Sequence, residues 1–212
     1  MLIGISQPTF MPWIGYFAFL DKIQKIIFLN DVQFEKRSWQ QRNYINLNSQ
    51  KHLITVPVKS KGKFNQKILD VKILHDKSYE LIKKKIFYAY NKSPYFKNYY
   101  DEICYIIDNE NDYLYKLNTA LIKFFINSLN IKINFDYSSN YSLNLKKEKL
   151  IFELCKLNKC NKYLTTRGSM DYLEGFKLIP GSNIEISYFE YRDVFYNQIS
   201  KNFIPKLSII DL

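Results

Sequence analysis

The sequence predicts an α/β fold in which helices flank a mainly parallel sheet. Short strand-like runs begin at Leu2, at Ile26 and at Lys162, and the first two are apolar enough to be buried. Stretches with the apolar spacing of amphipathic helices separate these runs. Strands that alternate with helices form parallel sheets, because each helix carries the chain back over the sheet before the next strand begins.

Composition sets the broad class of the protein. Of the 212 residues, 47% are hydrophobic and 17% are aromatic, so the chain has ample apolar surface for a core and is not disordered. Its length fits a single domain over residues 1–212. No apolar run reaches the roughly 20 residues of a membrane span, and no signal peptide is recognisable. We therefore expect a cytoplasmic protein.

Charge and cysteine content exclude several function classes. Lys and Arg number 31 against 20 Asp and Glu, which gives a formal charge of +11. The lysines are spread along the chain and no nucleic-acid-binding motif is present, so a solvated basic surface is favoured over a nucleic-acid partner. The three cysteines form no CxxC pattern, which argues against a disulfide framework and against a zinc site. No metal site is predicted.

The elements follow in order. Residues 2–5 form a buried strand, residues 14–23 carry apolar side chains at every third position of a helix, and residues 26–29 form a second buried strand. This opening is a βαβ unit, which is parallel and right-handed. A polar loop is expected over residues 30–51, with strands at 52–58 and 68–73.

A helical portion follows at about residues 78–130. The expected elements there are a helix at 79–90 with Ser78 as N-cap, a helix at 95–107, and a helix that Asp112 caps and that runs to about 129. The chain then alternates again, with a strand at 131–137, a helix at 145–157 and strands at 162–165 and 183–191.

Ligands bind at the carboxyl ends of the strands in parallel sheets, which selects three loops. In the first loop, residues 6–16, Gln7 supplies a donor and an acceptor, and Trp13 and Tyr16 supply aromatic surface. The alternative is a rigid buried turn whose aromatic residues belong to the core.

The second loop, residues 30–43, crowds acids, amides, cations and a tryptophan together. Arg37 and Arg42 suit bidentate contacts with phosphate or carboxylate. Trp39 could stack on a ring, and Asp31 could bind a metal or a sugar hydroxyl. The alternative is a solvated loop whose charges pair with one another. The other candidates in this loop are Gln33, Lys36 and Asn43.

The third loop, residues 165–173, contains hydroxyl groups, a glycine, Arg167 and Tyr172. It follows a strand and is expected to open a helix, where it could bind an anion. The alternative is that Ser169 simply caps that helix. We expect the first and second loops to face each other across a shared crevice.

Four motifs resemble the WbqC-like family from end to end: ISQPTFMPWIGYF, FLNDVQFEKRSWQQRN, LITVPVK and YNQ…FIPKLSIIDL. Genes of this family occur in bacterial surface-polysaccharide (O-antigen) clusters, so the resemblance implies a transferase-type enzyme of sugar biosynthesis. Two positions depart from the family pattern: Ser6 stands where many members carry His, and Asn30-Asp31 replaces a pair of aspartates. The matched residues are Gln7, Pro8, Pro12, Trp13, Gly15, Tyr16, Asp31, Gln33, Lys36, Arg37, Trp39, Gln40, Arg42, Asn43, Tyr172 and Gln198.

A weaker resemblance concerns mechanism. The loop PTFMPWIGY, the VQF after the second strand, and TTRGSMDYL look like the arrangement in pantothenate synthetase. That resemblance implies a Rossmann-like, nucleotidylyltransferase-like sheet and makes ATP a possible cosubstrate, although the HxGH phosphate motif is missing here.

Together these observations predict an enzyme that modifies a nucleotide-linked amino sugar by transfer of an acyl or aminoacyl group to the sugar amine. Asp31 is the candidate general base, Gln7 and Gln33 would orient the acyl donor, and Arg37 and Arg42 would hold the diphosphate. The other candidate substrate-binding residues are Trp13, Tyr16, Lys36, Trp39, Asn43, Arg167, Tyr172 and Gln198. A glycosyltransferase acting on the same substrate and a non-catalytic sugar-nucleotide binding module are the alternatives.

Overall fold

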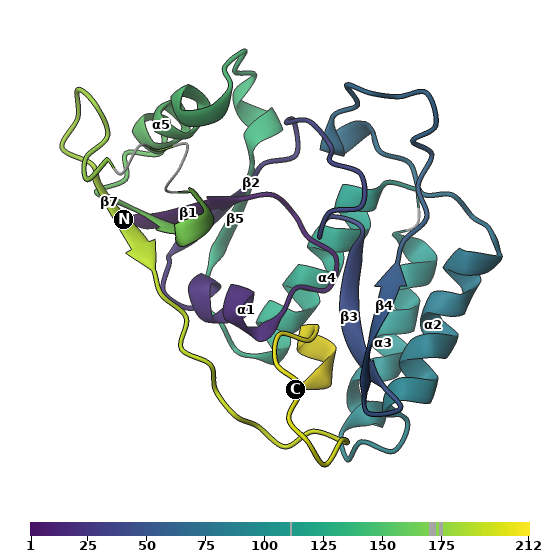
Figure 1. The fold of residues 1–212 in the computed structure, drawn as a ribbon. Coiled ribbons are helices and arrows are strands. Elements are labelled where there is room, and N and C mark those ends of the chain that lie inside the picture. The colour runs from purple at the N-terminus through teal and green to yellow at the C-terminus, as the bar shows by residue number, and fades with distance from the viewer. Residues whose placement is uncertain (111, 170–172, 174–175) are drawn as a thin grey trace.

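A five-stranded parallel sheet forms the centre of the protein (Figure 1). The computed structural model describes residues 1–110, 112–169, 173 and 176–212. In spatial order the strands are β5 (Asn134–Tyr137), β2 (Lys25–Phe28), β1 (Leu2–Ser6), β6 (Lys162–Thr166) and β7 (Glu185–Phe189). Every neighbouring pair runs parallel. The predicted α/β fold with a mainly parallel sheet is therefore confirmed.

The winding of the sheet reverses beside its central strand. From β1 the chain moves outward to β2 and β5, then returns past β1 to form β6 and β7. The registers Ser6↔Phe28 and Gly4↔Leu164 fix β1 between its two neighbours. Crevices at the carboxyl ends of strands form where the winding direction changes, so the end of β1 is the natural place for a ligand.

Helices cover both faces of the sheet (Figure 1). Side chains alternate along β2: Ile26 and Phe28 join the core on the side of α1 (Ile14–Leu20) and α4 (Leu114–Ser128). Ile27 joins the opposite core, beside α5 (Lys147–Leu157). This alternation is what a strand buried on both faces requires.

The segment between β2 and β5 adds an antiparallel hairpin and three helices. The hairpin strands are β3 (Arg42–Leu47) and β4 (Gln50–Thr55), and the helices are α2 (Lys77–Tyr90), α3 (Phe96–Asn109) and α4. The hairpin lies against α2 (Figure 1). The three helices span the predicted helical portion.

Two predicted elements in this segment are wrong. Residues 42–47 form β3 rather than a loop. The strand was missed because two of its buried positions are asparagines, Asn43 and Asn46, whose amides are hydrogen-bonded, so the sequence lacks the apolar alternation of a strand. Residues 68–73 are not a strand: they contain a short 3₁₀ helix, Ile68–Asp70, followed by isolated bridges. Their apolar side chains fill the core without joining a sheet.

The N-cap residues predicted for two helices are wrong. Asp76 rather than Ser78 caps α2, since its carboxylate accepts hydrogen bonds from the backbone N–H groups of Ser78 and Tyr79 at 2.8 and 3.1 Å. Tyr113 occupies the N-cap position of α4, so Asp112 does not cap it. Among the described helices, none combines the length and the apolar character needed to cross a membrane.

The C-terminal segment, residues 190–212, leaves β7 and returns to end beside α1 and β3 (Figure 1). The backbone N–H of Ser208 donates to the carbonyl oxygen of Tyr44 at 2.8 Å, and that of Ile209 donates to the carbonyl oxygen of Pro12 at 2.8 Å. The end of the chain thus contacts both the first loop and the hairpin.

Candidate functional site

The first and second predicted loops lie against each other. The side-chain amide of Gln40 donates to Oε1 of Gln7 at 2.8 Å, and the backbone N–H of Phe10 donates to the carbonyl oxygen of Trp39 at 2.9 Å. The two loops, which were expected to face each other across a crevice, therefore contact each other directly at the carboxyl end of β1.

Two buried asparagines hold the loops in place. Asn118, which is 0% exposed on α4, donates to the carbonyl oxygens of Pro8 and Gln40 at 3.0 and 2.7 Å. Asn43, on β3, donates to the carbonyl oxygen of Met11 at 2.8 Å. These amides thus satisfy three buried carbonyl groups of the two loops and hold the loops against the rest of the fold.

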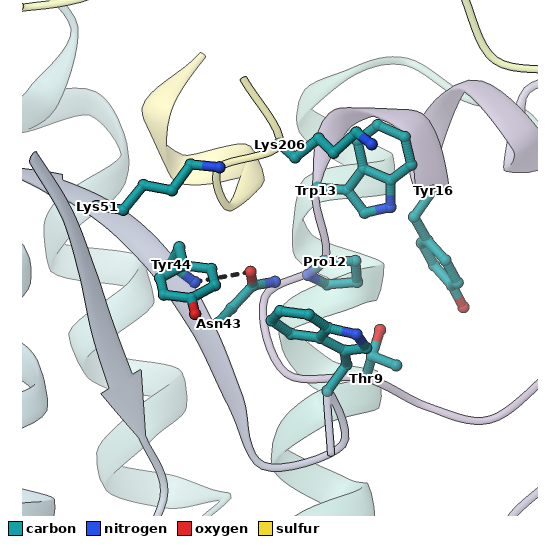
Figure 2. A pocket seen from close by; sticks show the side chains of 9 residues that line it. Thr9, Pro12, Trp13, Tyr16, Asn43, Tyr44, Lys51 and Lys206 are labelled. Carbon is teal, nitrogen blue, oxygen red and sulfur yellow. Dashed lines mark hydrogen bonds between the residues drawn. The ribbon is translucent and has the colours of Figure 1, made fainter. Parts of the chain in front are cut away.

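A pocket of about 460 Å³ opens where the two loops, the hairpin and the C-terminal segment meet (Figure 2). Its lining residues are Thr9, Pro12, Trp13, Tyr16, Trp39, Asn43, Tyr44, Lys51 and Lys206. Four of them were predicted as site residues: Trp13, Tyr16, Trp39 and Asn43. The pocket also contains both tryptophans of the chain.

Each tryptophan of the pocket makes an edge-to-face contact with a tyrosine ring. Trp13 contacts Tyr191 edge-on with ring centroids 4.8 Å apart, and Trp39 contacts Tyr44 edge-on at 5.8 Å. Trp39 remains 53% exposed. A Cβ atom on Gly15 would lie 2.3 Å from the Trp13 ring, so only glycine permits this position of the indole.

Tyr16 joins the pocket to the end of the central strand. Its hydroxyl lies 3.0 Å from the hydroxyl of Ser6, the last residue of β1. Burial raises the pKa of Tyr16 well above its ordinary value of 10.0, and the hydrogen bond with Ser6 offsets only part of that rise. Tyr16 is therefore a neutral phenol that can donate or accept one hydrogen bond.

The cations of the pocket are lysines that the sequence analysis missed. Lys51 comes from β4 and its ammonium group lies 5.8 Å from the Tyr44 ring centroid. Lys206 comes from the C-terminal segment, and Figure 2 shows both lysines along one rim of the pocket. The family motif FIPKLSIIDL contains Lys206 and was the one available signal for it.

The predicted cations of the second loop lie elsewhere. Arg37 is exposed, and Arg42 is half-buried at the start of β3. The ammonium group of Lys36 lies 5.5 Å from the Phe64 ring centroid. None of the three lines the pocket.

Asp31 lies at the carboxyl edge of the sheet, just beyond β2, and not in the pocket lining. Its carboxylate accepts a hydrogen bond from the hydroxyl of Ser138, which follows β5. The neighbouring Asn30 donates to the Ser139 hydroxyl at 3.0 Å. Gln33 is exposed, donates to the carbonyl oxygen of Phe64 at 3.2 Å and does not line the pocket.

The remaining predicted residues are dispersed. Arg167, in a 3₁₀ turn after β6, forms an exposed ion pair with Glu190. Tyr172 lies outside the described residues, as does most of the helix expected there. Gln198 donates to Asp211 at 2.6 Å and both donates to and accepts from the backbone of Ile204, so it shapes the C-terminal segment.

Over the part of the chain that the structure describes, no group of three or more His, Cys, Asp and Glu side chains is arranged to hold a metal ion. The polar groups nearest the pocket are amides, hydroxyls and ammonium groups. Such a set can bind an anion and a ring, and it can orient a carbonyl group.

A relative and a protein family match nearly the whole length of the chain. The chain is 28% identical over 214 residues to the uncharacterized protein Rv1507c of Mycobacterium tuberculosis, an alignment that covers 99% of this chain and 91% of that protein. No solved structure matches the chain significantly. The WbqC-like protein family matches over residues 7–212, nearly the whole chain. The match includes the two loops, the hairpin and the C-terminal segment that build the pocket, and the chain belongs to the WbqC-like protein family.

Proposed function

We propose that this protein is a cytoplasmic enzyme of surface-polysaccharide biosynthesis that acylates the amine of a nucleotide-linked amino sugar. The observation that carries the proposal is the pocket itself, in which two tryptophans and two lysines surround about 460 Å³ beside the end of β1. Aromatic faces bind bases and sugar rings, and ammonium groups bind phosphates. Membership of the WbqC-like family supports the assignment to sugar biosynthesis.

The reaction needs an amine nucleophile and an activated acyl or aminoacyl donor. The sugar nitrogen attacks the acyl carbon, a C–N bond forms, the bond from that carbon to its leaving group breaks, and the nitrogen loses a proton. Where the donor is a free amino acid, ATP would supply the activation. A general base is required because a protonated amine has no free electron pair.

Asp31 is the candidate base. Ser6 pairs with Phe28 in the sheet register, so Gln7 and Asp31 leave neighbouring strands at the same edge. The hydrogen bond from Ser138 orients the Asp31 carboxylate. Gln7, which is exposed and oriented by Gln40, is the candidate for holding the acyl carbonyl group.

Mass spectrometry tests the proposal. The purified protein is incubated with UDP-, dTDP- and GDP-linked amino sugars, together with acyl thioesters, or with amino acids and ATP. The expected product is an intact nucleotide sugar whose mass has increased by one acyl group. Release of the nucleoside diphosphate with the sugar attached to an acceptor would instead identify a glycosyltransferase. Binding without any product would identify a binding module.

A further inference from the structure

We propose that Lys51 and Lys206 act as a pair that binds the diphosphate of the nucleotide sugar, in place of the arginines of the second loop. This inference rests on the proposed function for its substrate class. It assigns the anion-binding part of the pocket to two residues that come from β4 and from the C-terminal segment.

The charged side chains that line the pocket are all positive. The lining of the pocket includes two lysines and no Asp or Glu. Among the described residues, the ion pairs involve other lysines and Arg167, and no carboxylate pairs with Lys51 or Lys206. Both lysines are exposed to solvent, and two uncompensated positive charges in one pocket attract an anion.

Contacts between distant parts of the chain bring both lysines to the same pocket. They are 155 positions apart in the sequence, and the hydrogen bond from Ser208 to Tyr44 joins the C-terminal segment to β3, the partner strand of β4. Asp211 fixes the end of that segment by accepting hydrogen bonds from the hydroxyls of Tyr90 and Tyr196 at 3.1 and 2.9 Å. A buried hydrogen-bond network thus fixes the C-terminal segment, which contributes Lys206 to the pocket.

The ligand class follows from the matching of charge and size. Two ammonium groups match the two or more negative charges of a diphosphate, and the tryptophans lie within the same pocket to receive a ring. A volume of about 460 Å³ lies within the range of about 300–1,000 Å³ for small-ligand sites. The diphosphate therefore binds at the lysine rim while the base or sugar lies against Trp13 or Trp39.

Calorimetric titration tests the pair directly. Wild-type protein and the variants Lys51→Met and Lys206→Met are titrated with UDP, dTDP and GDP and with the matching nucleosides. Methionine keeps the apolar stem and removes the charge. Each variant should lose about tenfold in affinity for the preferred diphosphate, because one of the two ammonium groups that contact it has been removed. Affinity for the nucleoside should change by less than about twofold.

Lys149→Met is the matched control. Lys149 is exposed on α5, which covers the other face of the sheet, and its loss changes the net charge equally. This variant should bind like the wild type, and thermal unfolding should show that all three variants are folded. Raising the salt concentration should weaken diphosphate binding to the wild type more than to either pocket variant.

If the lysine variants lost affinity equally for the nucleoside and for the diphosphate, the inference would be overturned, because the lysines would then only shape the pocket wall. Unchanged diphosphate affinity, or no diphosphate binding by the wild type, would also overturn it. These results are separable from the proposed function. Acylated product formed at full rate by both lysine variants would leave the function standing without the pair, whereas lysine-dependent binding without acylated product would leave the pair standing without the function.

Discussion

The pocket and the carboxyl edge beside β2 and β5 use polar residues in opposite ways. In the pocket, the amides of Asn43, Asn118 and Gln40 are consumed in holding the loops together, and the exposed surface is aromatic and cationic. At the edge, the half-buried carboxylate of Asp31 accepts a hydrogen bond from the buried hydroxyl of Ser138. In the proposed function these two regions have different roles: the pocket binds the nucleotide sugar, and Asp31 at the edge accepts the proton.

The largest expected effect separates these two roles. Asp31→Asn should lower kcat on the order of a thousandfold, within the range for removal of a general base, because an amide cannot accept the proton from the amine. The KM for the nucleotide sugar should change little, since Asp31 does not line the pocket. Steady-state kinetics measures both quantities. Full turnover by a folded Asp31→Asn variant would remove Asp31 as the base.

Loss of the amide beneath the loops should damage the pocket. Asn118→Leu removes the donor to two buried carbonyl oxygens, of Pro8 and Gln40. An unsatisfied buried group costs about 1–3 kcal/mol, so the free energy of unfolding in urea should fall by about 3 kcal/mol and nucleotide affinity should fall with it. Asn98→Leu, at an exposed position of α3, is the control and should change stability by less than about 0.5 kcal/mol. Equal stability of the two variants would contradict this role.

The turn that follows β5 is held by a charged network around Asp136, which protonation of that carboxylate should weaken. Burial pushes the pKa of Asp136 upward, but hydrogen bonds from Lys25, Tyr141, Asn140 and the backbone of Tyr137 outweigh it and lower the pKa from 3.8 to about 2. A lowered pKa contributes stability above the unfolded value. That stability, about 2 kcal/mol, should be lost as the pH falls from about 4 through 2.

Urea unfolding at a series of pH values measures this contribution. Asp136→Asn should be less stable than the wild type at pH 6, and its stability should depend less on pH between 4 and 2. Because Asp136 also braces the turn at Ser138–Tyr141, the same variant should lower activity through Ser138. A parallel acid dependence in both proteins would show that other carboxylates dominate.

The smallest expected effect concerns the link between the two regions. Tyr16→Phe removes one partly buried hydrogen bond with Ser6 and keeps the aromatic wall. Stability should fall by about 1 kcal/mol, and nucleotide affinity should change by less than about threefold. Thermal unfolding and calorimetry measure these effects. A loss of affinity as large as that expected for the lysine variants would show that the Tyr16 hydroxyl itself contacts the ligand.

The spacing of apolar residues in the sequence predicted the strands and helices whose burial is regular along the chain. The apolar runs at β1 and β2 and the helical periods of α2 to α4 were readable, because burial there follows a regular spacing. β3 was not readable, since its buried Asn43 and Asn46 owe their burial to partners far along the chain. Trp13 and Trp39 stood in recognisable loops. Lys51 and Lys206 enter the site only through tertiary contacts, which spacing does not encode.

The proposed function requires the nucleotide sugar to bind in the pocket that contains the two tryptophans. Because Trp13 and Trp39 are the two tryptophans of the chain, the variants Trp13→Phe and Trp39→Phe each leave one reporter in the pocket. Titration of both variants with the nucleotide-linked amino sugar that forms product should change the fluorescence of each, with matching midpoints. Saturating sugar nucleotide that leaves both tryptophans unchanged would contradict the proposed function.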